Sequence, residues 1–155
     1  MLTLLFVTGC KKDATDVSYP PVPSFPESWG MIGTTGADGF SASSLNAALI
    51  KDTLSGKYTL NVNGWDASTD RSIYLHYKDL SFEAGNYYVF RVNSPGADSS
   101  FVFYQKDHLE TEFGAGLLTI YGTADSLVKG TYDFTTASGL RIQGVYTIRP
   151  HYFYE

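Results

Sequence analysis

The sequence contains a single cysteine, Cys10, so no disulfide can form within the chain. Charged residues make up 17% of its 155 residues, and only 11 residues are lysine or arginine. Binding to nucleic-acid phosphates needs a clustered basic surface, so this content and the formal net charge of −5 disfavour a general nucleic-acid-binding protein. No apolar run approaches the roughly 20 residues that a membrane-spanning helix requires. The length leaves room for one domain.

Aromatic residues are abundant, with 12 tyrosines and 10 phenylalanines, so a core can form despite the modest aliphatic content. No stretch sustains a helical period over a dozen residues, and short segments rich in strand-forming residues alternate with glycine, asparagine and aspartate. The sequence therefore predicts an all-β fold over residues 30–155. We expect a single antiparallel β-sandwich or barrel-like domain of about eight or nine strands.

Alternation of apolar and polar residues marks the strands with one buried face, for example Tyr58, Leu60 and Val62 against their polar neighbours. The same period predicts strands around residues 73–77, 128–134 and 140–148. Residues 87–92 are apolar on both faces apart from Arg91, which predicts a central strand. Residues 43–51 are compatible with a strand or with a helical turn.

Dipeptides that favour chain reversal separate these segments. They are Asp38-Gly39, Gly85-Asn86, Pro95-Gly96 and Ser138-Gly139. Each supplies a residue that tolerates a positive φ or has a preset φ, so we expect a turn at each.

The amino end resembles a bacterial lipobox, because an apolar stretch and two small residues, Thr8-Gly9, precede Cys10. The resemblance implies that residues 1–9 are a lipoprotein signal peptide, which is removed, and that Cys10 becomes the lipidated first residue. Residues 10–29 then form a tether, extended by the prolines between Pro20 and Pro26. The expected partner at this end is a membrane, held through the lipid anchor.

The start Cys10-Lys-Lys-Asp13 and the later segments Tyr58-Thr-Leu-Asn-Val-Asn-Gly64 and Val128-Lys-Gly-Thr-Tyr-Asp-Phe134 are similar to those of a Bacteroidota lipoprotein family with no established activity. The resemblance covers residues 30 to the end. It implies a small envelope domain of unknown function, on the periplasmic or surface face of the outer membrane, with no catalytic residue to carry over.

Side chains that carry chemistry are few and scattered. His76, His108 and His151 have no metal-ligand spacing, and His76 falls on the solvated face of its strand, so we expect no metal and no cofactor. Glu110 and Glu112 share one strand face, whereas a catalytic carboxylate pair normally flanks its substrate from separate elements.

The segment Asp66-Ala-Ser-Thr-Asp70 opens like a calcium loop, because oxygen ligands stand at alternate positions. Arg71 stands where that loop needs glycine, and Tyr77 where it needs a bidentate glutamate. A polar hairpin turn is therefore the better interpretation.

Most aromatic residues are needed inside the domain, including Tyr58, Tyr77, Tyr132, Phe134 and Tyr146. Trp65, Tyr74 and Tyr121 remain as candidates for an exposed ligand-binding surface, since aromatic faces provide contact area at little entropic cost.

The sequence thus favours a lipid-anchored cell-envelope β-domain with a non-enzymatic binding or structural role, partnered with an envelope protein or a glycan. The alternative is a carbohydrate-binding surface lipoprotein associated with glycan uptake. A third interpretation is a hydrolase whose site is assembled from distant strands.

Metabolic labelling with a palmitate analogue tests the anchor directly. We expect the wild-type protein to incorporate the label in its native bacterium and Cys10→Ala to lose it, because the thioether has no other thiol on which to form. Equal labelling of the two proteins would contradict acylation at Cys10.

Overall fold

The computed structural model describes residues 24–81, 87–93, 99–107, 110–124 and 127–154. They form eleven strands and contain no helix, so none of them belongs to a helix that could cross a membrane. The strands are β1 (Gly30–Thr35), β2 (Asp38–Ser41), β3 (Ser44–Lys51), β4 (Tyr58–Asp66), β5 (Arg71–Leu80), β6 (Tyr87–Val92), β7 (Phe101–Lys106), β8 (Glu110–Ala124), β9 (Leu127–Thr136), β10 (Arg141–Ile148) and β11 (His151–Tyr154).

The prediction of an all-β protein is confirmed, but the expected eight or nine strands are too few for the eleven in the described residues. The short strands explain the difference. The two strands that the sequence did not indicate, β1 and β2, have 6 and 4 residues, so each face offers too few positions for an alternation to stand out. Cys10 and the tether up to residue 23 lie outside the described residues.

All strands belong to one sheet, in the order β11-β3-β4-β5-β7-β8-β9-β10-β1-β2, with β6 paired to β8 beside this path. Every pairing is antiparallel except that of β11 with β3, which is parallel. The chain runs from β2 at one end of this order directly into β3 near the other end.

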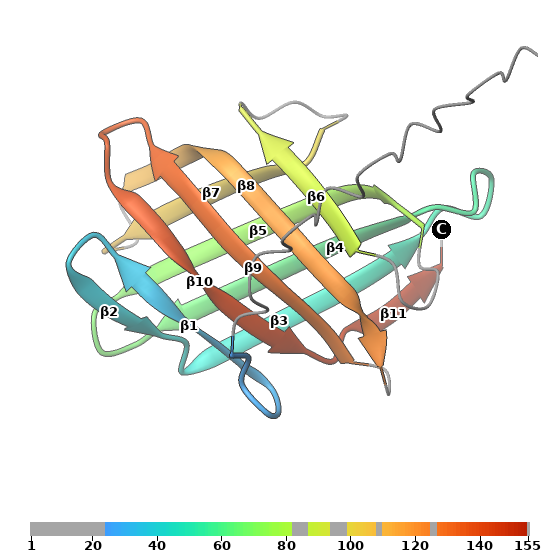
Figure 1. The fold of residues 1–155 in the computed structure, drawn as a ribbon, viewed down its shortest axis with the longest axis horizontal. Coiled ribbons are helices and arrows are strands. Elements are labelled where there is room, and N and C mark those ends of the chain that lie inside the picture. Colours follow the sequence, from blue (N-terminus) through green and yellow to red (C-terminus); the bar gives the residue numbers. More distant parts are fainter. Residues whose placement is uncertain (1–23, 82–86, 94–98, 108–109, 125–126, 155) are drawn as a thin grey trace, which may run out of the picture.

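The sheet folds over into two layers that cross each other (Figure 1). We call β3, β4, β5 and β7 the back layer, and β6, β8, β9, β10 and β1 the front layer. The 15-residue strand β8 joins them, because Glu110 to Gly114 pair with β7 while Gly116 to Tyr121 pair with β6. Each layer therefore has an inner face toward the other layer and an outer face.

The core lies between the layers and follows the alternation in the sequence. Leu60 and Val62 of β4 are fully buried, and Ile73, Leu75 and Tyr77 of β5 are too. Residues 44–51 form a strand rather than a helical turn, because Leu45, Ala47 and Leu49 alternate into the same core.

The prediction of a central strand at residues 87–92 is wrong. Among the described residues β6 pairs with β8 alone, and Val89 on its outer face is 52% exposed. Apolar residues on both faces of a strand do not by themselves show that it has a partner on each edge, and β6 is an edge strand in this part of the chain.

Two of the expected turns lie within the described residues. Ser138-Gly139 is confirmed as the turn between β9 and β10, and Gly139 has a φ of 88°. The expected turn at Asp38-Gly39 is wrong, because the reversal occurs at Gly36-Ala37, where Gly36 has a φ of 66°. Gly85-Asn86 and Pro95-Gly96 lie outside the described residues.

Inner-face aromatic rings lie over glycines of neighbouring strands. The Tyr146 ring of β10 covers Gly130 of β9, and its hydroxyl donates a 2.7 Å hydrogen bond to the hydroxyl of Tyr77 in the back layer. Tyr132 of β9 lies across Gly144 and Gly33, and its hydroxyl donates to the carbonyl oxygen of Ile32 at 3.1 Å. These glycines leave the space that the rings need.

A methyl group at Gly130 should destabilise the fold. In Gly130→Ala the added Cβ collides with the Tyr146 ring and lies 2.6 Å from the Thr119 carbonyl oxygen. We expect a loss of about 1–3 kcal/mol in the free energy of unfolding, measured by denaturant titration. Gly39→Ala is the matched control, because no atom lies within 4 Å of its Cβ. Coincident unfolding midpoints for the two variants would contradict this packing.

Candidate functional site

The outer face of the back layer carries a continuous cluster of aromatic rings, which we call the aromatic face. It comprises Tyr74 and His76 of β5, Phe101 and Phe103 of β7, and Phe113 of β8. Tyr74 stacks on Phe103 with 4.7 Å between ring centroids, and His76 stacks on Phe101 at 4.4 Å. Phe113 meets Phe103 edge-on at 6.0 Å and is 42% exposed.

The strand period and register place these rings together. Tyr74 lies opposite Phe103 and His76 opposite Phe101 in the β5–β7 pairing, while Phe103 lies opposite Phe113 in the next pairing. The residues between them, such as Leu75 and Val102, point into the core. Cross-strand aromatic pairs stabilise a sheet, and here they also form an apolar platform toward solvent.

Asn61 of β4 fixes the polar edge of the aromatic face. Its Oδ1 accepts a hydrogen bond from the Tyr74 hydroxyl at 2.9 Å and lies 2.7 Å from Nδ1 of His76. Because an amide oxygen only accepts, the His76 hydrogen lies on Nδ1, and Nε2 is left as the acceptor of the neutral ring.

Burial, and secondarily the positive charge of Lys78, lower the pKa of His76. Burial raises the pKa of Tyr74, so its hydroxyl stays a donor.

A groove of about 280 Å³ adjoins the aromatic face. Its surface is almost entirely apolar, although asparagines of β3 and β4 are among the residues around it. The residues that line it are Asn46, Ala47, Ala48, Asn61, Asn63, Tyr74, His151 and Phe153. An apolar groove bordered by amide-bearing residues is a candidate binding place for a small neutral ligand.

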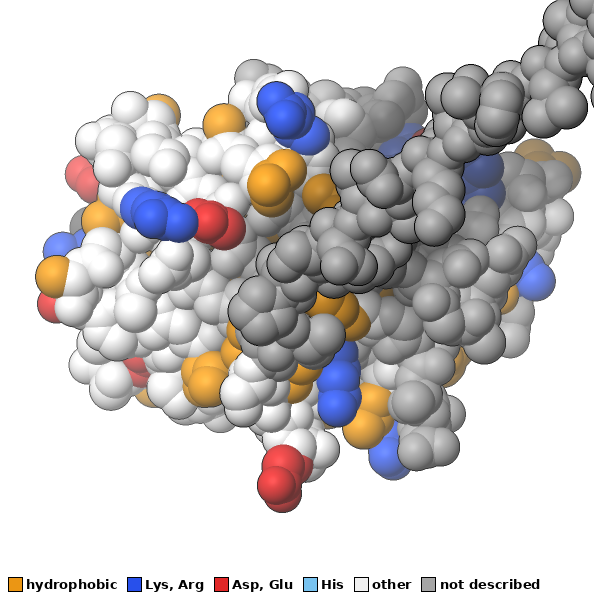
Figure 2. All heavy atoms as spheres, in the orientation of Figure 1, with side chains coloured by type: hydrophobic (Ala, Val, Ile, Leu, Met, Phe, Trp, Pro, Cys, Tyr) orange, Lys and Arg blue, Asp and Glu red, His pale blue; other side chains and the backbone are white. Residues whose placement is uncertain are grey.

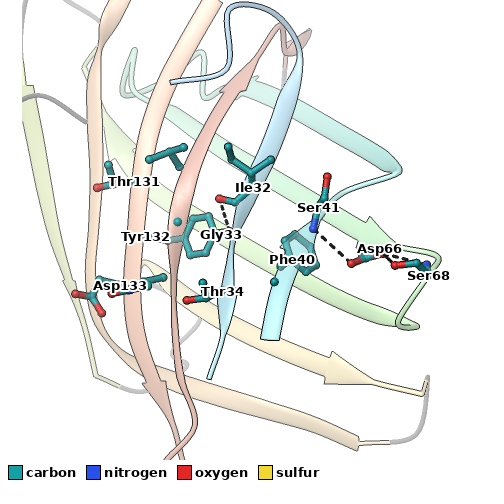
Figure 3. A pocket seen from close by; sticks show the side chains of 14 residues that line it. Ile32, Gly33, Thr34, Phe40, Ser41, Asp66, Ser68, Thr131, Tyr132 and Asp133 are labelled. Carbon is teal, nitrogen blue, oxygen red and sulfur yellow. Dashed lines mark hydrogen bonds between the residues drawn. The ribbon is translucent and has the colours of Figure 1, made fainter. Parts of the chain in front are cut away.

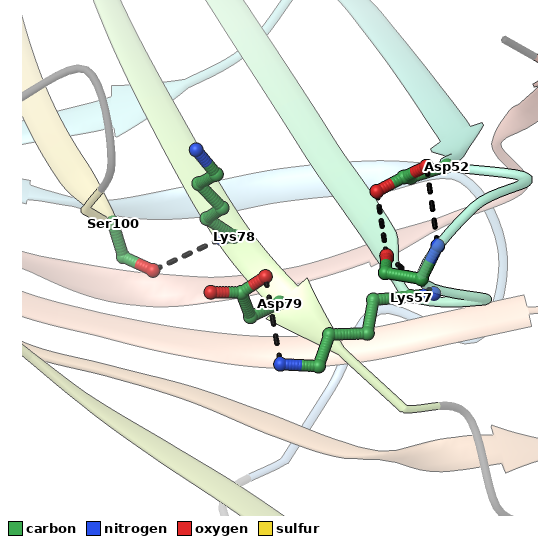
Figure 4. A network of polar contacts seen from close by, with 6 residues as sticks. Asp52, Lys57, Lys78, Asp79 and Ser100 are labelled. Atoms are coloured by element: carbon green, nitrogen blue, oxygen red, sulfur yellow. Dashed lines mark hydrogen bonds and ion pairs between the residues drawn. The ribbon is translucent and has the colours of Figure 1, made fainter.

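The other end of the aromatic face is charged (Figure 4). Lys57 lies 3.8 Å from the carboxylate of Asp79, and the backbone nitrogen of Lys78 donates to Ser100 Oγ at 3.0 Å. Asp52 accepts hydrogen bonds from the backbone nitrogen of Leu54 and the Ser55 hydroxyl, which, with the Ser55 backbone nitrogen, lower its pKa. These contacts hold the turn between β3 and β4 in shape.

The front layer has a larger but shallower hollow of about 800 Å³ on its outer side (Figure 3). Ile32 and Thr34 of β1, Thr131 of β9 and the backbone of Gly33 line it, with Asp66 and Ser68 at its rim. Burial acts to raise the pKa of Asp66, but hydrogen bonds from Ser68 and from the Ser41 backbone outweigh burial and lower it. The Asp66 carboxylate thus braces the turn at residues 66–70 rather than facing a ligand.

The residues 66–70 form the hairpin turn between β4 and β5, as the sequence analysis favoured over a calcium loop. Among the described residues, no group of three or more histidine, cysteine, aspartate or glutamate side chains lies close enough to hold a metal ion. Glu110 and Glu112 line a small cleft of about 190 Å³ with Arg71, and Glu112 accepts a hydrogen bond from the Ser138 backbone nitrogen at 2.9 Å.

The structure brings two of the predicted ligand-binding residues onto one outer face. Tyr74 is in the aromatic face, and Trp65 of β4 is one position further along, opposite Ser72, where it is 36% exposed and donates to Asp70 at 3.2 Å. Tyr121 lies elsewhere, on the front layer, with its ring 5.2 Å from that of Phe25. Cys10 and His108 lie outside the described residues.

Sequence reasoning missed Phe101, Phe103 and Phe113 as surface residues and treated His76 as merely solvated. The alternation of Phe101 and Phe103 signals that they share a face, as does that of Tyr74 and His76. Only the pairing of β5 with β7, which skips β6, unites the two sets.

No family model matches this sequence, and no curated protein or solved structure matches it either.

The environment of His76 predicts a lowered pKa, which can be measured. We expect an NMR titration to show His76 titrating below the ordinary value of 6.5, because burial and Lys78 both disfavour the charged ring. Lys78→Gln should raise the pKa toward that value, whereas Lys106→Gln, at the far end of β7, should leave it unchanged. A wild-type pKa above 6.5 would show that the ring is not held as described.

Proposed function

We propose that this protein is a lipid-anchored cell-envelope domain, on the outer membrane, with a non-enzymatic binding role. The observation that supports a binding role is the aromatic face, where Phe113 is 42% exposed among stacked and edge-on rings. Exposed apolar surface in one place is characteristic of binding sites on soluble domains. The sandwich-like folding of the sheet supports this role, since it fills the interior with large side chains and leaves recognition to the outer faces.

The non-enzymatic role is supported by the contacts of the chemically capable groups. His76 is held by Asn61 and the Phe101 ring, and Glu112 is held by Ser138. Both groups are thereby engaged in organising strands and a turn, and they lie on different parts of the surface. Glu110 and Glu112 line one cleft but come from the same strand, whereas the carboxylate pair that hydrolyses a glycosidic bond normally flanks its substrate from separate elements.

A glycan is the second element of the proposal, and the groove beside Tyr74 favours it. Asn46 and Asn63 face each other across β3 and β4 and are exposed, so their amides are available to hydroxyl groups. Tyr74, whose ring is stacked on Phe103, lines the same groove. Stacking on an aromatic ring combined with amide hydrogen bonds fits a neutral oligosaccharide, as a surface lipoprotein associated with glycan uptake would require.

A panel of immobilised neutral oligosaccharides tests the proposal. We expect wild-type protein to be retained by at least one member, and Phe113→Ala and Trp65→Ala to bind about tenfold more weakly, because each removes an aromatic contact. Leu117→Ala is the matched control, since Leu117 lies on the same strand as Phe113, is 45% exposed and stands outside the aromatic face.

Two outcomes would count against it. Absence of retention by any oligosaccharide would overturn the glycan assignment. Equal weakening by Phe113→Ala and Leu117→Ala would overturn the assignment of the aromatic face as the binding surface.

A further inference from the structure

The outer face of the front layer differs in character from the aromatic face. Its exposed apolar side chains are aliphatic and separate: Ile32 is 45% exposed, Val89 52% and Leu117 45%. Register places Arg91 directly opposite Leu117, and Leu117 opposite Asp133. Aliphatic groups interspersed with arginine are therefore spread across several strands rather than gathered into one pocket (Figure 2).

Acidic residues outnumber basic residues in the whole chain, but they do not among the described residues of this face. Arg91 is exposed, Lys129 lies on β9, and Arg141 on β10 forms a 2.8 Å ion pair with Asp133. On the part of this face that the structure describes, these three cations stand against three acids, Asp133, Asp66 and the exposed Glu27 at the border, so this face is close to neutral while the whole chain has a formal net charge of −5. Aliphatic side chains with arginine and lysine match a bilayer surface that contains anionic headgroups.

The segment that leads toward Cys10 is fastened to this same face. We call residues 24–29 the strap. The Phe25 ring packs edge-on against Tyr121 of β8 and lies 5.9 Å from Nζ of Lys129. The carbonyl oxygen of Pro26 accepts a 2.7 Å hydrogen bond from the Thr147 hydroxyl of β10. The chain therefore leaves the described domain from the outer face of the front layer.

We propose that the outer face of the front layer rests on the bilayer that carries the Cys10 lipid, and that the aromatic face is thereby directed away from the membrane. This inference rests on the lipid anchor of the proposed function. Residues 11–23 join Cys10 to the strap, and an extended chain of that length spans at most about 45 Å. The anchor thus keeps this face close to the bilayer at a high effective concentration, where weak contacts suffice.

The hollow between Ile32 and Asp66 opens on the same face. Thr34, Thr131 and Ile32 line it together with the carboxylates of Asp66 and Asp133, so the hollow itself adds no positive charge to this face. A second copy of the chain is the rival occupant of this face, and the experiment below separates the two.

The two tryptophans lie in different places, one in the strap and one beside the aromatic face. Trp29 ends the strap at the start of β1 and is 44% exposed, whereas Trp65 lies beside the aromatic face and is 36% exposed. Full-length protein would be coupled through its only cysteine to a maleimide phospholipid in vesicles that contain phosphatidylglycerol and lipids brominated near the headgroup. Trp65→Phe leaves the emission of Trp29, and Trp29→Phe leaves that of Trp65.

We expect Trp29 to be quenched about twofold or more relative to Trp65, because contact of this face with the bilayer brings it near the headgroups. Leu117→Glu should remove the difference, and Phe113→Glu, on the same strand, should preserve it. Equal quenching of the two tryptophans, or stronger quenching of Trp65, would overturn the orientation. So would an unquenched Trp29 combined with dimers detected by cross-linking on the vesicles, which would assign the face to a second copy.

Chemical coupling separates this inference from the anchor itself. If cells do not acylate Cys10, the palmitate labelling fails while the vesicle experiment still reports which face meets the bilayer. If acylation occurs but the orientation is wrong, labelling succeeds and the tryptophan difference is absent.

Discussion

The packing of inner-face aromatic rings over glycines is the constraint on which the rest of the structure depends. Tyr132 and Tyr146 reach across neighbouring strands because Gly33, Gly130 and Gly144 carry no side chain in their way. The hydroxyl bond between Tyr146 and Tyr77 then ties the front layer to the back layer in the middle of the core. Both tyrosines are fully buried, and burial raises their pKa values, so each stays protonated and able to share that bond.

A filled interior decides where function can lie. With rings of this size between the layers, recognition is left to the outer faces, and the two outer faces differ. The back layer presents stacked and edge-on aromatic rings beside asparagine side chains, whereas the front layer presents separate aliphatic groups and cations. Strand β8 passes from the back layer to the front layer. Phe113 therefore lies in the aromatic face, whereas Leu117, on the same strand, lies on the outer face of the front layer.

The sequence predicted what depends on local alternation and missed what depends on distant pairing. The all-β class and the buried positions of β4, β5 and β9 follow from period two, and Gly139 marks its turn. The number of strands and the edge position of β6 depend on which strands become neighbours. Asp38-Gly39 has the composition of a turn, but the flanking register placed the reversal at Gly36, a glycine that the pattern does not distinguish. For the candidate site, the sequence proposed Trp65, Tyr74 and Tyr121 as the aromatic residues not needed in the core. Tyr74 and Trp65 lie on the outer face of the back layer, whereas Tyr121 lies on the front layer, a difference that depends on strand pairing.

The short strand β11 has a practical consequence. Among the described strands it pairs with β3 alone, in parallel, and its His151 and Phe153 line the groove beside Tyr74. Affinity tags and fluorescent fusions added after the last residue would therefore emerge beside that groove and crowd it.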